Sequence, residues 1–469
     1  MKKIFLPLLC SISFLSFSQF KESIQLDSIF ATWDQLETPG AALGIVKDGE
    51  LIYAKGYGSA DLEHDLPITP SSVFYIGSVS KQFVTFCILL LEEQGKLDLD
   101  DKIQKYLPDF PEYEAPLTIR HFIHHTSGVR DYLTLMDLKG RSYLDNLDVN
   151  EVYELIKRQK ELNFTPGEKY LYSNSCYFML AMIVEKVSHE SIRKFAHEHI
   201  FAPLGMQNTL FYDDNTDLIK NRVFSYQKKK EDEGFDNLIM RFDLVGSGGV
   251  YSSIEDLFLW DQNFYHNILG KGGQDIIKKM HQEGVLNNGE SAGYAFALNN
   301  GTYKGLRTVS HAGALAGYRA QLLRFPDEKF SVIILANRDD ANPTGKSYQV
   351  ADILLKGRFK EEPPKNEVSD KKEAKTTKEK EMDMAFVDVM DYVGNFYSEE
   401  LDATYKLYVE NDLLKLKIVN NEPQDLEKVN EPDSFISNGN RYRFERTDGK
   451  VIGFKLDAGR VTNLKFKKQ

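Results

Sequence analysis

A charged stretch near residue 370 divides the chain and limits what it can fold into. Residues 360–383 read KEEPPKNEVSDKKEAKTTKEKEMD and are rich in lysine, glutamate, proline and threonine. Such a segment buries too little apolar surface to order itself, so we expect a linker over residues 357–385. The 469-residue chain has the length for two unequal domains or three average ones. The linker therefore predicts a large domain over residues 19–356 and a small one over residues 386–469.

Residues 1–18 have the pattern of a signal peptide. Two lysines follow the initial methionine, and residues 4–17 form an apolar stretch that is too short to span a bilayer. Serines at suitable spacing fit cleavage before Gln19. Cys10 lacks the small preceding residue of a lipoprotein site, so lipidation is the weaker alternative. We expect an exported protein, either periplasmic or secreted.

The charge balance argues against some partners. The chain has 58 lysine and arginine residues against 70 aspartate and glutamate residues, a formal charge of −12, and no basic stretch on an aromatic-rich face. Nucleic acid or an anionic membrane is therefore not the expected main partner. No transmembrane helix follows the signal peptide, so we predict no stable membrane insertion.

Two cysteines, Cys87 and Cys176, remain after the signal peptide, each inside an apolar helical pattern. Pairing in an oxidising compartment is the alternative, but cysteines placed in this way are more often buried free thiols. Neither has the neighbours of a metal site. We predict neither a metal nor another cofactor.

Strand patterns at both ends of the large domain predict one sheet. Residues 41–46 and 51–55 flank an Asp-Gly turn, and residues 319–325 and 330–335 flank a Pro-Asp-Glu turn; both pairs are typical of β-hairpins. Residues 97–242 are mostly helical in pattern. We expect an α+β fold in which a helical block is inserted between the two halves of an antiparallel sheet.

The small domain has the pattern of an all-β unit. Its short strand-like segments are separated by Asn-Asp and Asp-Gly turns. This spacing favours a small antiparallel β-barrel. The expected strands are residues 405–409, 413–418, 441–445, 451–455 and 461–466.

The pattern Ser-x-x-Lys occurs five times, but only Ser78 has a setting that suits catalysis. Roughly two occurrences are expected by chance at average residue usage. Ser78 follows an extended approach and a glycine, and it precedes a long apolar helical pattern over residues 80–95. The other four lie at the signal-peptide boundary, in a polar helix start, in a charged excursion and in the linker. They begin at Ser18, Ser191, Ser225 and Ser369.

Ser78 and Lys81 are a candidate nucleophile and base. Positions i and i+3 share a helix face, whereas Ser80 diverges from Lys81. A buried lysine with a lowered pKa accepts a proton, which a surface ammonium cannot do. The N–H of a serine at a helix start is also placed to stabilise an oxyanion. The alternative is an ordinary amphipathic helix with a few polar residues at its start.

A second element supplies a candidate acid. In residues 164–175, FTPGEKYLYSNS, Tyr172 and Asn174 alternate onto one side of an expected extended strip. A nearby ammonium stabilises a phenolate, so Tyr172 suits proton transfer to a leaving group. The amide of Asn174 is able to hydrogen-bond both the lysine and a substrate carbonyl.

A third element, VSHAGALAG at residues 309–317, precedes the second hairpin. Gly313 allows a strand edge to approach a substrate backbone, and the N–H of Ala314 is a candidate second oxyanion donor. His311 is a candidate for tuning the base or for binding a substrate group. A structural histidine at a strand start explains His311 equally well.

The three elements in this order make the chain resemble the serine β-lactamase and penicillin-binding-protein superfamily. It is most similar to the branch that holds class C β-lactamases, D-aminopeptidases, alkaline D-peptidases and β-lactamase-fold esterases. Residues 117–128 (LTIRHFIHHTSG) and 246–257 (GSGGVYSSIEDL) also fit, and the resemblance covers about residues 28–355. Residues 392–397 and 459–464 make the tail similar to lipocalin-like domains that follow some of these hydrolases.

The resemblance implies a β-lactamase-like sheet flanked by helices, and it implies a role for each candidate residue. Ser78 would be the acylated nucleophile and Lys81 its base. Tyr172 would protonate the leaving group and activate the incoming water. Asn174 and residues 311–314 would position the substrate.

One departure from the family pattern affects the expected substrate. Many β-lactamases and DD-peptidases have Lys-Thr-Gly or His-Thr-Gly where this chain has His-Ala-Gly at residues 311–313. A fixed positive charge and a hydroxyl, which commonly hold a substrate carboxylate, are both missing. We therefore expect hydrolysis of small esters or peptides, including those with D-amino acids, and weak or no β-lactamase activity. The alternative is an idle protein that binds peptidoglycan, peptide or lipid; the barrel's role and homo-oligomer formation stay open.

Overall fold

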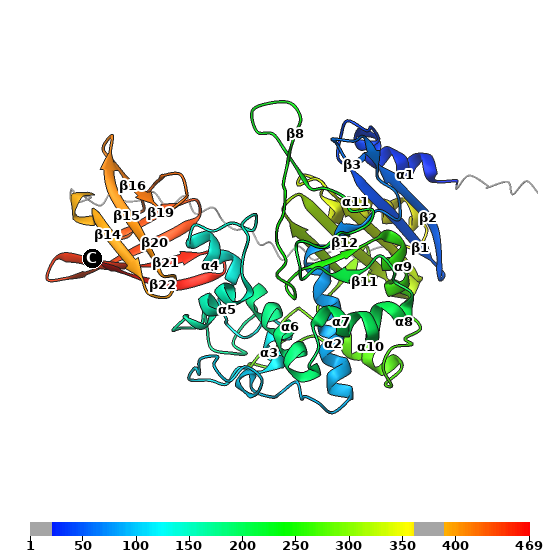
Figure 1. The fold of residues 1–469 in the computed structure, drawn as a ribbon, viewed down its shortest axis with the longest axis horizontal. Coiled ribbons are helices and arrows are strands. Elements are labelled where there is room, and N and C mark those ends of the chain that lie inside the picture. The colour runs from blue at the N-terminus through cyan, green and yellow to red at the C-terminus, as the bar shows by residue number, and fades with distance from the viewer. Residues whose placement is uncertain (1–20, 361–388) are drawn as a thin grey trace, which may run out of the picture.

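The computed structural model describes residues 21–360 and 389–469. The predicted signal peptide over residues 1–18 lies outside the described residues, and so do residues 361–385 of the predicted linker. The described part has the expected α+β fold, with a β-barrel at its C-terminal end (Figure 1).

A six-stranded antiparallel sheet forms the centre of the large domain. Its strand order, β10-β11-β12-β13-β1-β2, places the early and the late hairpin side by side. The register pairs Ala41 of β1 with Ala336 of β13. Both predicted hairpins and their association in one sheet are confirmed. The strands are β1 (Ala41–Lys47), β2 (Glu50–Tyr57), β10 (Asn299–Tyr303), β11 (Leu306–Leu315), β12 (Tyr318–Phe325) and β13 (Phe330–Ala336).

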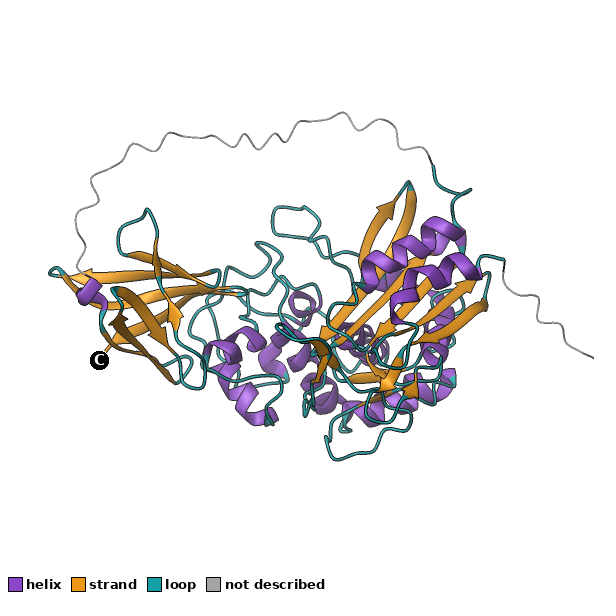
Figure 2. Cartoon of the chain, turned by 90° about the horizontal axis from the view of Figure 1, so that it is seen from above, coloured by secondary structure: helices purple, strands orange, loops and turns teal. Residues whose placement is uncertain are grey.

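Helices cover both faces of this sheet (Figure 2). Successive side chains of a strand point to opposite faces, so a strand buried on both sides reads as a continuous apolar run. In β1, Leu43 belongs to the cluster that packs against α1 and α11, whereas the neighbouring Ala42 belongs to the main core. The covering helices are α1 (Ser23–Phe30) and α11 (Pro343–Leu354) on one face and α9 (Ile254–Asn263) on the other.

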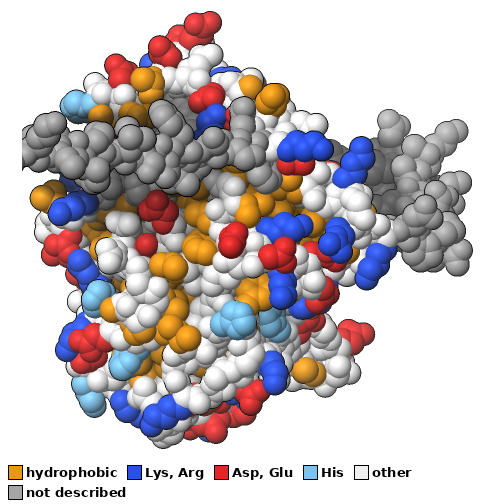
Figure 3. All heavy atoms as spheres, turned by 90° about the vertical axis from the view of Figure 1, so that its right-hand side faces the viewer, with side chains coloured by type: hydrophobic (Ala, Val, Ile, Leu, Met, Phe, Trp, Pro, Cys, Tyr) orange, Lys and Arg blue, Asp and Glu red, His pale blue; other side chains and the backbone are white. Residues whose placement is uncertain are grey.

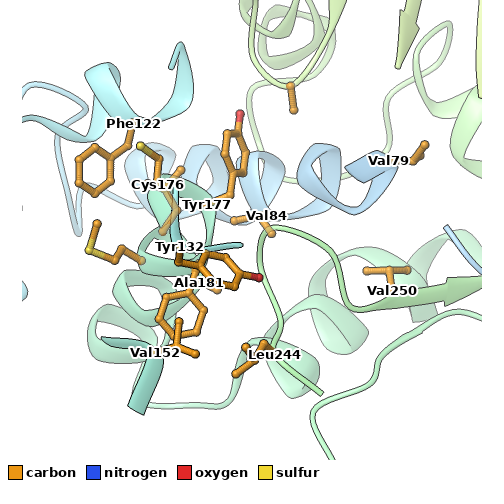
Figure 4. Close-up of a cluster of buried hydrophobic side chains, with 14 of the residues drawn as sticks. Val79, Val84, Phe122, Tyr132, Val152, Cys176, Tyr177, Ala181, Leu244 and Val250 are labelled. Atoms are coloured by element: carbon orange, nitrogen blue, oxygen red, sulfur yellow. The ribbon is translucent and has the colours of Figure 1, made fainter. Parts of the chain in front are cut away.

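Helix α2 (Lys81–Glu93) runs through the main core. Every residue of α2 as far as Leu91 is buried, as expected for a helix with protein on all sides. It packs against α6 (Asn174–Ser188), and Figure 4 shows Cys176 of α6 among the side chains of this cluster. Cys176 and Cys87 are free, buried thiols, as predicted. The first residue of α2 is thereby placed in a dry environment.

Short helices and strands make up the rest of the large domain. Ser191, which begins another Ser-x-x-Lys, only caps a helix: its Oγ accepts a hydrogen bond of 3.2 Å from the N–H of Lys194. The helices and helical turns are η1 (Ala31–Trp33), η2 (Gly77–Ser80), η3 (Ile103–Lys105), α3 (Ile119–Ile123), α4 (Tyr132–Leu138), α5 (Val149–Lys157), α7 (Ile192–Ala196), η4 (His197–Phe201), α8 (Ala202–Leu204), α10 (Gln274–Met280) and η5 (Pro326–Glu328). The strands are β3 (Ser59–Asp61), β4 (Leu66–Pro67), β5 (Phe74–Tyr75), β6 (Leu210–Phe211), β7 (Tyr226–Lys228), β8 (Phe235–Asn237) and β9 (Val250–Ser252).

The C-terminal part is a nearly closed, nine-stranded antiparallel barrel. Aromatic rings fill its interior; for example, Phe454 stacks on Phe466 with ring centroids 4.5 Å apart. All five strands predicted for this region are present. After the turn η6 (Val389–Tyr392), the nine strands of the barrel are β14 (Gly394–Ser398), β15 (Ala403–Glu410), β16 (Leu413–Lys417), β17 (Gln424–Asp425), β18 (Glu427–Lys428), β19 (Ser434–Ser437), β20 (Asn440–Thr447), β21 (Lys450–Ala458) and β22 (Val461–Lys468).

The barrel lies beside α4 and α5 of the large domain (Figure 1). Arg130, which has a fully buried side chain, forms an ion pair of 2.7 Å with Glu400 of the barrel. It also donates a 2.7 Å hydrogen bond to the carbonyl of Thr462. The hydroxyl of Tyr405 donates to the carbonyl of Leu138 over 2.6 Å. The barrel is thus joined to the large domain through buried, directional polar contacts, so the docking is specific.

The surface is mixed in charge on the face drawn in Figure 3. Basic and acidic side chains alternate over this face, and apolar groups lie between them. Such mixing creates no broad electropositive field on this face. Within residues 21–360 and 389–469, no helix combines the length and the apolarity required to cross a bilayer.

Candidate active site

Ser78 lies in the helical turn η2, directly before α2, and lines a cleft of about 700 Å³. Its side chain is half-buried and therefore accessible from the cleft. Its Oγ is 3.0 Å from Nζ of Lys81, so the predicted i, i+3 pair is in contact. Ser80 instead accepts a hydrogen bond of 3.1 Å from the N–H of Val250, away from the lysine.

The amine of Lys81 has three oxygen partners. Nζ lies 3.0 Å from Ser78 Oγ, 3.0 Å from Asn174 Oδ1, and in close contact with the carbonyl of Ser247. The amide and carbonyl oxygens are only acceptors, whereas the hydroxyl of Ser78 can also donate. A neutral amine has two N–H groups and one lone pair, so these partners direct its lone pair at Ser78. The geometry suits a base that receives the serine proton.

Burial of Lys81 favours the neutral form of its amine. Removal from water is the main cause that lowers the pKa of Lys81 well below its ordinary value of 10.5. The carboxylate of Asp131 acts in the opposite direction, and the positive charge of Arg460 adds to the lowering. The requirement that the predicted base be buried is therefore met.

Tyr172 also lies beside the lysine. Nζ of Lys81 is 4.9 Å from the centroid of the Tyr172 ring, and the ring of His125 packs on it at 4.1 Å. The hydroxyl of Tyr172 is buried and has no hydrogen-bonding partner among the described residues. Burial raises its pKa above the ordinary value of 10.0, while the nearby Ser78 hydroxyl acts in the opposite direction. Tyr172 is thus a phenol that keeps its proton near pH 7.

The expected extended strip around Tyr172 is shorter in the structure than in the prediction. Asn174 is the first residue of α6, and Ser173 before it is the extended N-cap residue. The backbone N–H of Asn174 donates to Asp131 Oδ2 over 2.6 Å, which fixes the helix start. The side chain of Asn174 still reaches Lys81, because the helix begins at the wall of the cleft.

Two glycines bring the serine turn and strand β11 into close contact. A Cβ on Gly77 would lie 2.5 Å from the nitrogen of Ala314, and one on Gly313 would lie 3.0 Å from the nitrogen of Ser78. Gly77 also has a φ of +54°, which favours glycine. The close approach places two backbone nitrogens beside the nucleophile, as an oxyanion site requires.

Strand β11 presents a free edge to the cleft at residues 311–315. Its pairing with β10 ends where Asn299 meets Ser310, so the following residues have a strand partner only in β12. Gly313 and Ala314 both line the cleft. The predicted element therefore lies mostly within strand β11, directly before the hairpin of β12 and β13, and its open edge is available to a substrate backbone.

His311 is buried in the wall of the cleft and is neutral near pH 7. Its Nε2 lies 2.8 Å from the hydroxyl of Tyr294, and its Nδ1 lies 2.7 Å from the carbonyl of Ala312. The carbonyl only accepts, so Nδ1 carries the proton and Nε2 accepts from the tyrosine. Burial lowers the pKa of His311 to about 4. The residue supplies no fixed positive charge.

The sequence profile described as Beta-lactamase matches residues 27–355. The chain belongs to the beta-lactamase family. Penicillin-binding protein 4* of Bacillus subtilis (strain 168) is 30% identical over 412 residues, which cover 84% of this chain and 87% of that protein. D-aminopeptidase of Cereibacter sphaeroides is 29% identical over 352 residues, which cover 73% of this chain and 65% of that protein.

Solved structures share the fold of this member of the beta-lactamase family. The octameric penicillin-binding protein homologue from Pyrococcus abyssi superposes with a TM-score of 0.63 at 22% identity. The superposition covers 95% of this chain and all of that one, so it includes the barrel. Because the chain belongs to this family and is similar to hydrolases such as D-aminopeptidase, it is a serine hydrolase.

The structure also brings three residues to the site that the sequence did not indicate. Asp131 caps the start of α4 and contacts Asn174, and the carbonyl of Ser247 holds Lys81. Arg460 reaches the cleft from the barrel. Ser247 lies in the stretch 246–257 that resembles the family, but a backbone carbonyl leaves no signature in the residue type.

The described residues form one group that has the donors of a metal site, namely Glu190, Glu198 and His199. Its residues do not line the cleft, and they are partly or fully exposed. An acidic cluster on a surface is common without a metal ion.

The hydrolysis rate should rise with pH as Lys81 loses its proton. We expect kcat/KM for a neutral ester to follow a single acid limb and to level off well below pH 10.5. In Asp131→Asn, the carboxylate that raises the pKa of Lys81 is removed, so the limb should move to lower pH. Asp148→Asn, at the cap of α5, is the matched control and should leave the profile unchanged. A shift to higher pH in Asp131→Asn would exclude Lys81 as the base.

Proposed function

We propose that the protein is an exported serine hydrolase that acts through a Ser78 acyl-enzyme on esters or peptides, including peptides with D-amino acids. The observation that carries the proposal is the 3.0 Å contact between Ser78 Oγ and the buried amine of Lys81. Export rests on the pattern of residues 1–18, and mass spectrometry of the mature protein should find Gln19 at its N-terminus.

The geometry suggests the following sequence of proton transfers. Lys81 takes the proton of Ser78 as Oγ attacks the substrate carbonyl. The negative oxygen is stabilised by the backbone N–H groups of Ser78 and Ala314. Tyr172 then donates its proton to the leaving nitrogen or oxygen as the bond to the acyl carbon breaks, and the Lys81 ammonium restores it. A water molecule hydrolyses the acyl-enzyme in the reverse order of proton transfers, which returns Ser78 to its hydroxyl form.

The strand that receives the substrate lacks the groups that hold a β-lactam carboxylate. His311 is neutral, and residue 312 is an alanine, which has no hydroxyl to offer. A charge-assisted hydrogen bond contributes about 1.5–3 kcal/mol, or roughly 10- to 100-fold in kcat/KM. We therefore expect a p-nitrophenyl ester or a D-aminoacyl amide to be hydrolysed at least about 10-fold more efficiently than a cephalosporin. Faster cephalosporin turnover would overturn the substrate assignment.

The alternative is a protein that binds its ligand without turnover. The simultaneous presence of Ser78, Lys81 and Tyr172 in contact geometry favours the enzyme, because binding alone does not require a desolvated lysine. Labelling with a fluorophosphonate distinguishes an enzyme from a protein that only binds its ligand. An active Ser78 displaces fluoride from the probe, so the protein gains the mass of the probe less HF, whereas an idle binder stays unlabelled.

A further inference from the structure

One cation in the cleft comes from the C-terminal barrel. Arg460 lies in the tight turn between β21 and β22, yet its side chain lines the same cleft as Ser78. Its guanidinium carbon is 4.7 Å from the centroid of the Tyr172 ring. The barrel therefore forms part of the wall next to the predicted proton donor.

The position of this turn is fixed by hydrogen bonds to the large domain. The side chain of Asn163 donates to the carbonyl of Arg460 over 2.9 Å and accepts from the N–H of Thr462 over 2.8 Å. Arg130, which is buried and paired with Glu400, donates to the carbonyl of Thr462. These contacts, at the carbonyl of Arg460 and at Thr462, hold the backbone of the turn in place, and the Arg460 side chain lines the cleft from this fixed position.

The guanidinium of Arg460 has unused donors. Its one ionic partner within the described residues is Asp131, at 3.5 Å, and it donates no hydrogen bond of ordinary geometry to them. The same carboxylate already accepts from the backbone N–H groups of Asn174 and Thr134. The Arg460 side chain is 42% exposed. Its planar fork of N–H groups is thus open to an anion in the cleft.

Arg319 is the other arginine that lines the cleft, but its surroundings differ. Its guanidinium donates to the carbonyls of Ala316 and Tyr318, both over 2.8 Å. The carboxylates of Asp339 and Asp340 act on its charge. With His311 neutral as well, Arg460 is the cation beside Tyr172 that is best placed to receive a substrate group.

We propose that Arg460 binds a carboxylate on the leaving group, so that the barrel selects peptides cleaved directly before a free C-terminal residue. The inference rests on the proposed acyl-enzyme at Ser78. The leaving nitrogen must approach the hydroxyl of Tyr172 to receive its proton, and Arg460 lies against the ring of that tyrosine. In an amino-acid leaving group the carboxylate is two bonds from that nitrogen, within reach of the guanidinium.

This subsite is compatible with poor turnover of β-lactams. A fused β-lactam ring holds its carboxylate in one direction relative to the carbonyl under attack. A peptide leaving residue rotates about its N–Cα and Cα–C bonds, so its carboxylate can turn toward Arg460. The free edge of β11 holds the acyl portion of either substrate.

The test compares two substrates that differ only in the leaving group. One is an acylated dipeptide with a free C-terminal carboxylate, and the other is the same dipeptide as its C-terminal amide. We expect the wild-type full-length protein to favour the free acid by about 10- to 100-fold in kcat/KM. In Arg460→Met this ratio should fall to near 1, and in Arg460→Lys it should be partly kept because the charge remains. A ratio cancels any effect common to both substrates, including a changed pKa of Lys81.

Arg319→Met is the matched control, because it removes the other arginine of the cleft. It should keep the preference for the free acid; loss of the preference in Arg319→Met, or its persistence in Arg460→Met, would overturn the inference. Wild-type turnover without any preference would overturn it too and would leave the hydrolase function intact. Failure of the wild-type protein to acylate at Ser78 would instead overturn the proposed function. Circular dichroism and thermal unfolding confirm that each variant is folded.

Discussion

Replacement of Ser78 by alanine should reduce hydrolysis of every ester or amide substrate by at least about 10⁴-fold, because the reaction then has no nucleophile. The methyl group of alanine fits the half-buried site, so the fold should be unchanged. Steady-state hydrolysis of a p-nitrophenyl ester measures the loss. Intact-mass spectrometry after fluorophosphonate treatment should show one added probe in the wild-type protein and none in Ser78→Ala.

Ser80→Ala is the matched control for this substitution. The Ser80 hydroxyl accepts a hydrogen bond from the buried N–H of Val250, so its loss should lower the free energy of unfolding by about 1–3 kcal/mol. Activity per folded molecule should stay within a few-fold of the wild type. If Ser80→Ala removes labelling and Ser78→Ala keeps it, the assignment of the nucleophile is wrong.

Lys81→Met should lower kcat/KM by about 10²–10⁴-fold, since the serine proton then has no acceptor. Methionine fills much of the same space, and it removes the cost of keeping an amine out of water. The melting temperature should therefore be unchanged or higher while activity is lost. Initial rates and calorimetric unfolding of the same preparation measure both quantities.

Lys194→Met provides the comparison, because Lys194 belongs to another Ser-x-x-Lys in this chain. Its side chain is 56% exposed and pairs with Glu190 on the surface. Exposed ion pairs contribute about 0–1 kcal/mol, so neither stability nor activity should change much. Equal effects of the two lysine substitutions would show that Lys81 has only a structural role.

The local part of the site was predictable from spacing. Ser78 and Lys81 meet because residues three apart share one face of a helical turn, and this holds regardless of the rest of the fold. The apolar pattern of residues 80–95 also required a buried helix, and burial is what lowers the pKa of Lys81. The two hairpins and the barrel strands followed from alternation and turn residues in the same way.

No local pattern in the sequence predicted the contacts between distant segments. Tyr172 and His311 were found through short motifs, but the state of His311 depends on its burial and on the hydroxyl of Tyr294, which no local pattern predicts. The length of the extended segment at Tyr172 was overestimated, because the helix start at Asn174 is fixed by Asp131.

The sequence by itself determined the family, the domain types and the catalytic candidates, because these depend on periodicity and on residue type at short spacing. The tertiary structure decided which atoms surround them. The carbonyl of Ser247 on Lys81, the close approach of Gly77 to Ala314, and Arg460 beside Tyr172 join segments that are far apart along the chain. Such contacts arise from the packing of sheet, helices and barrel, and packing is a property of the folded chain as a whole.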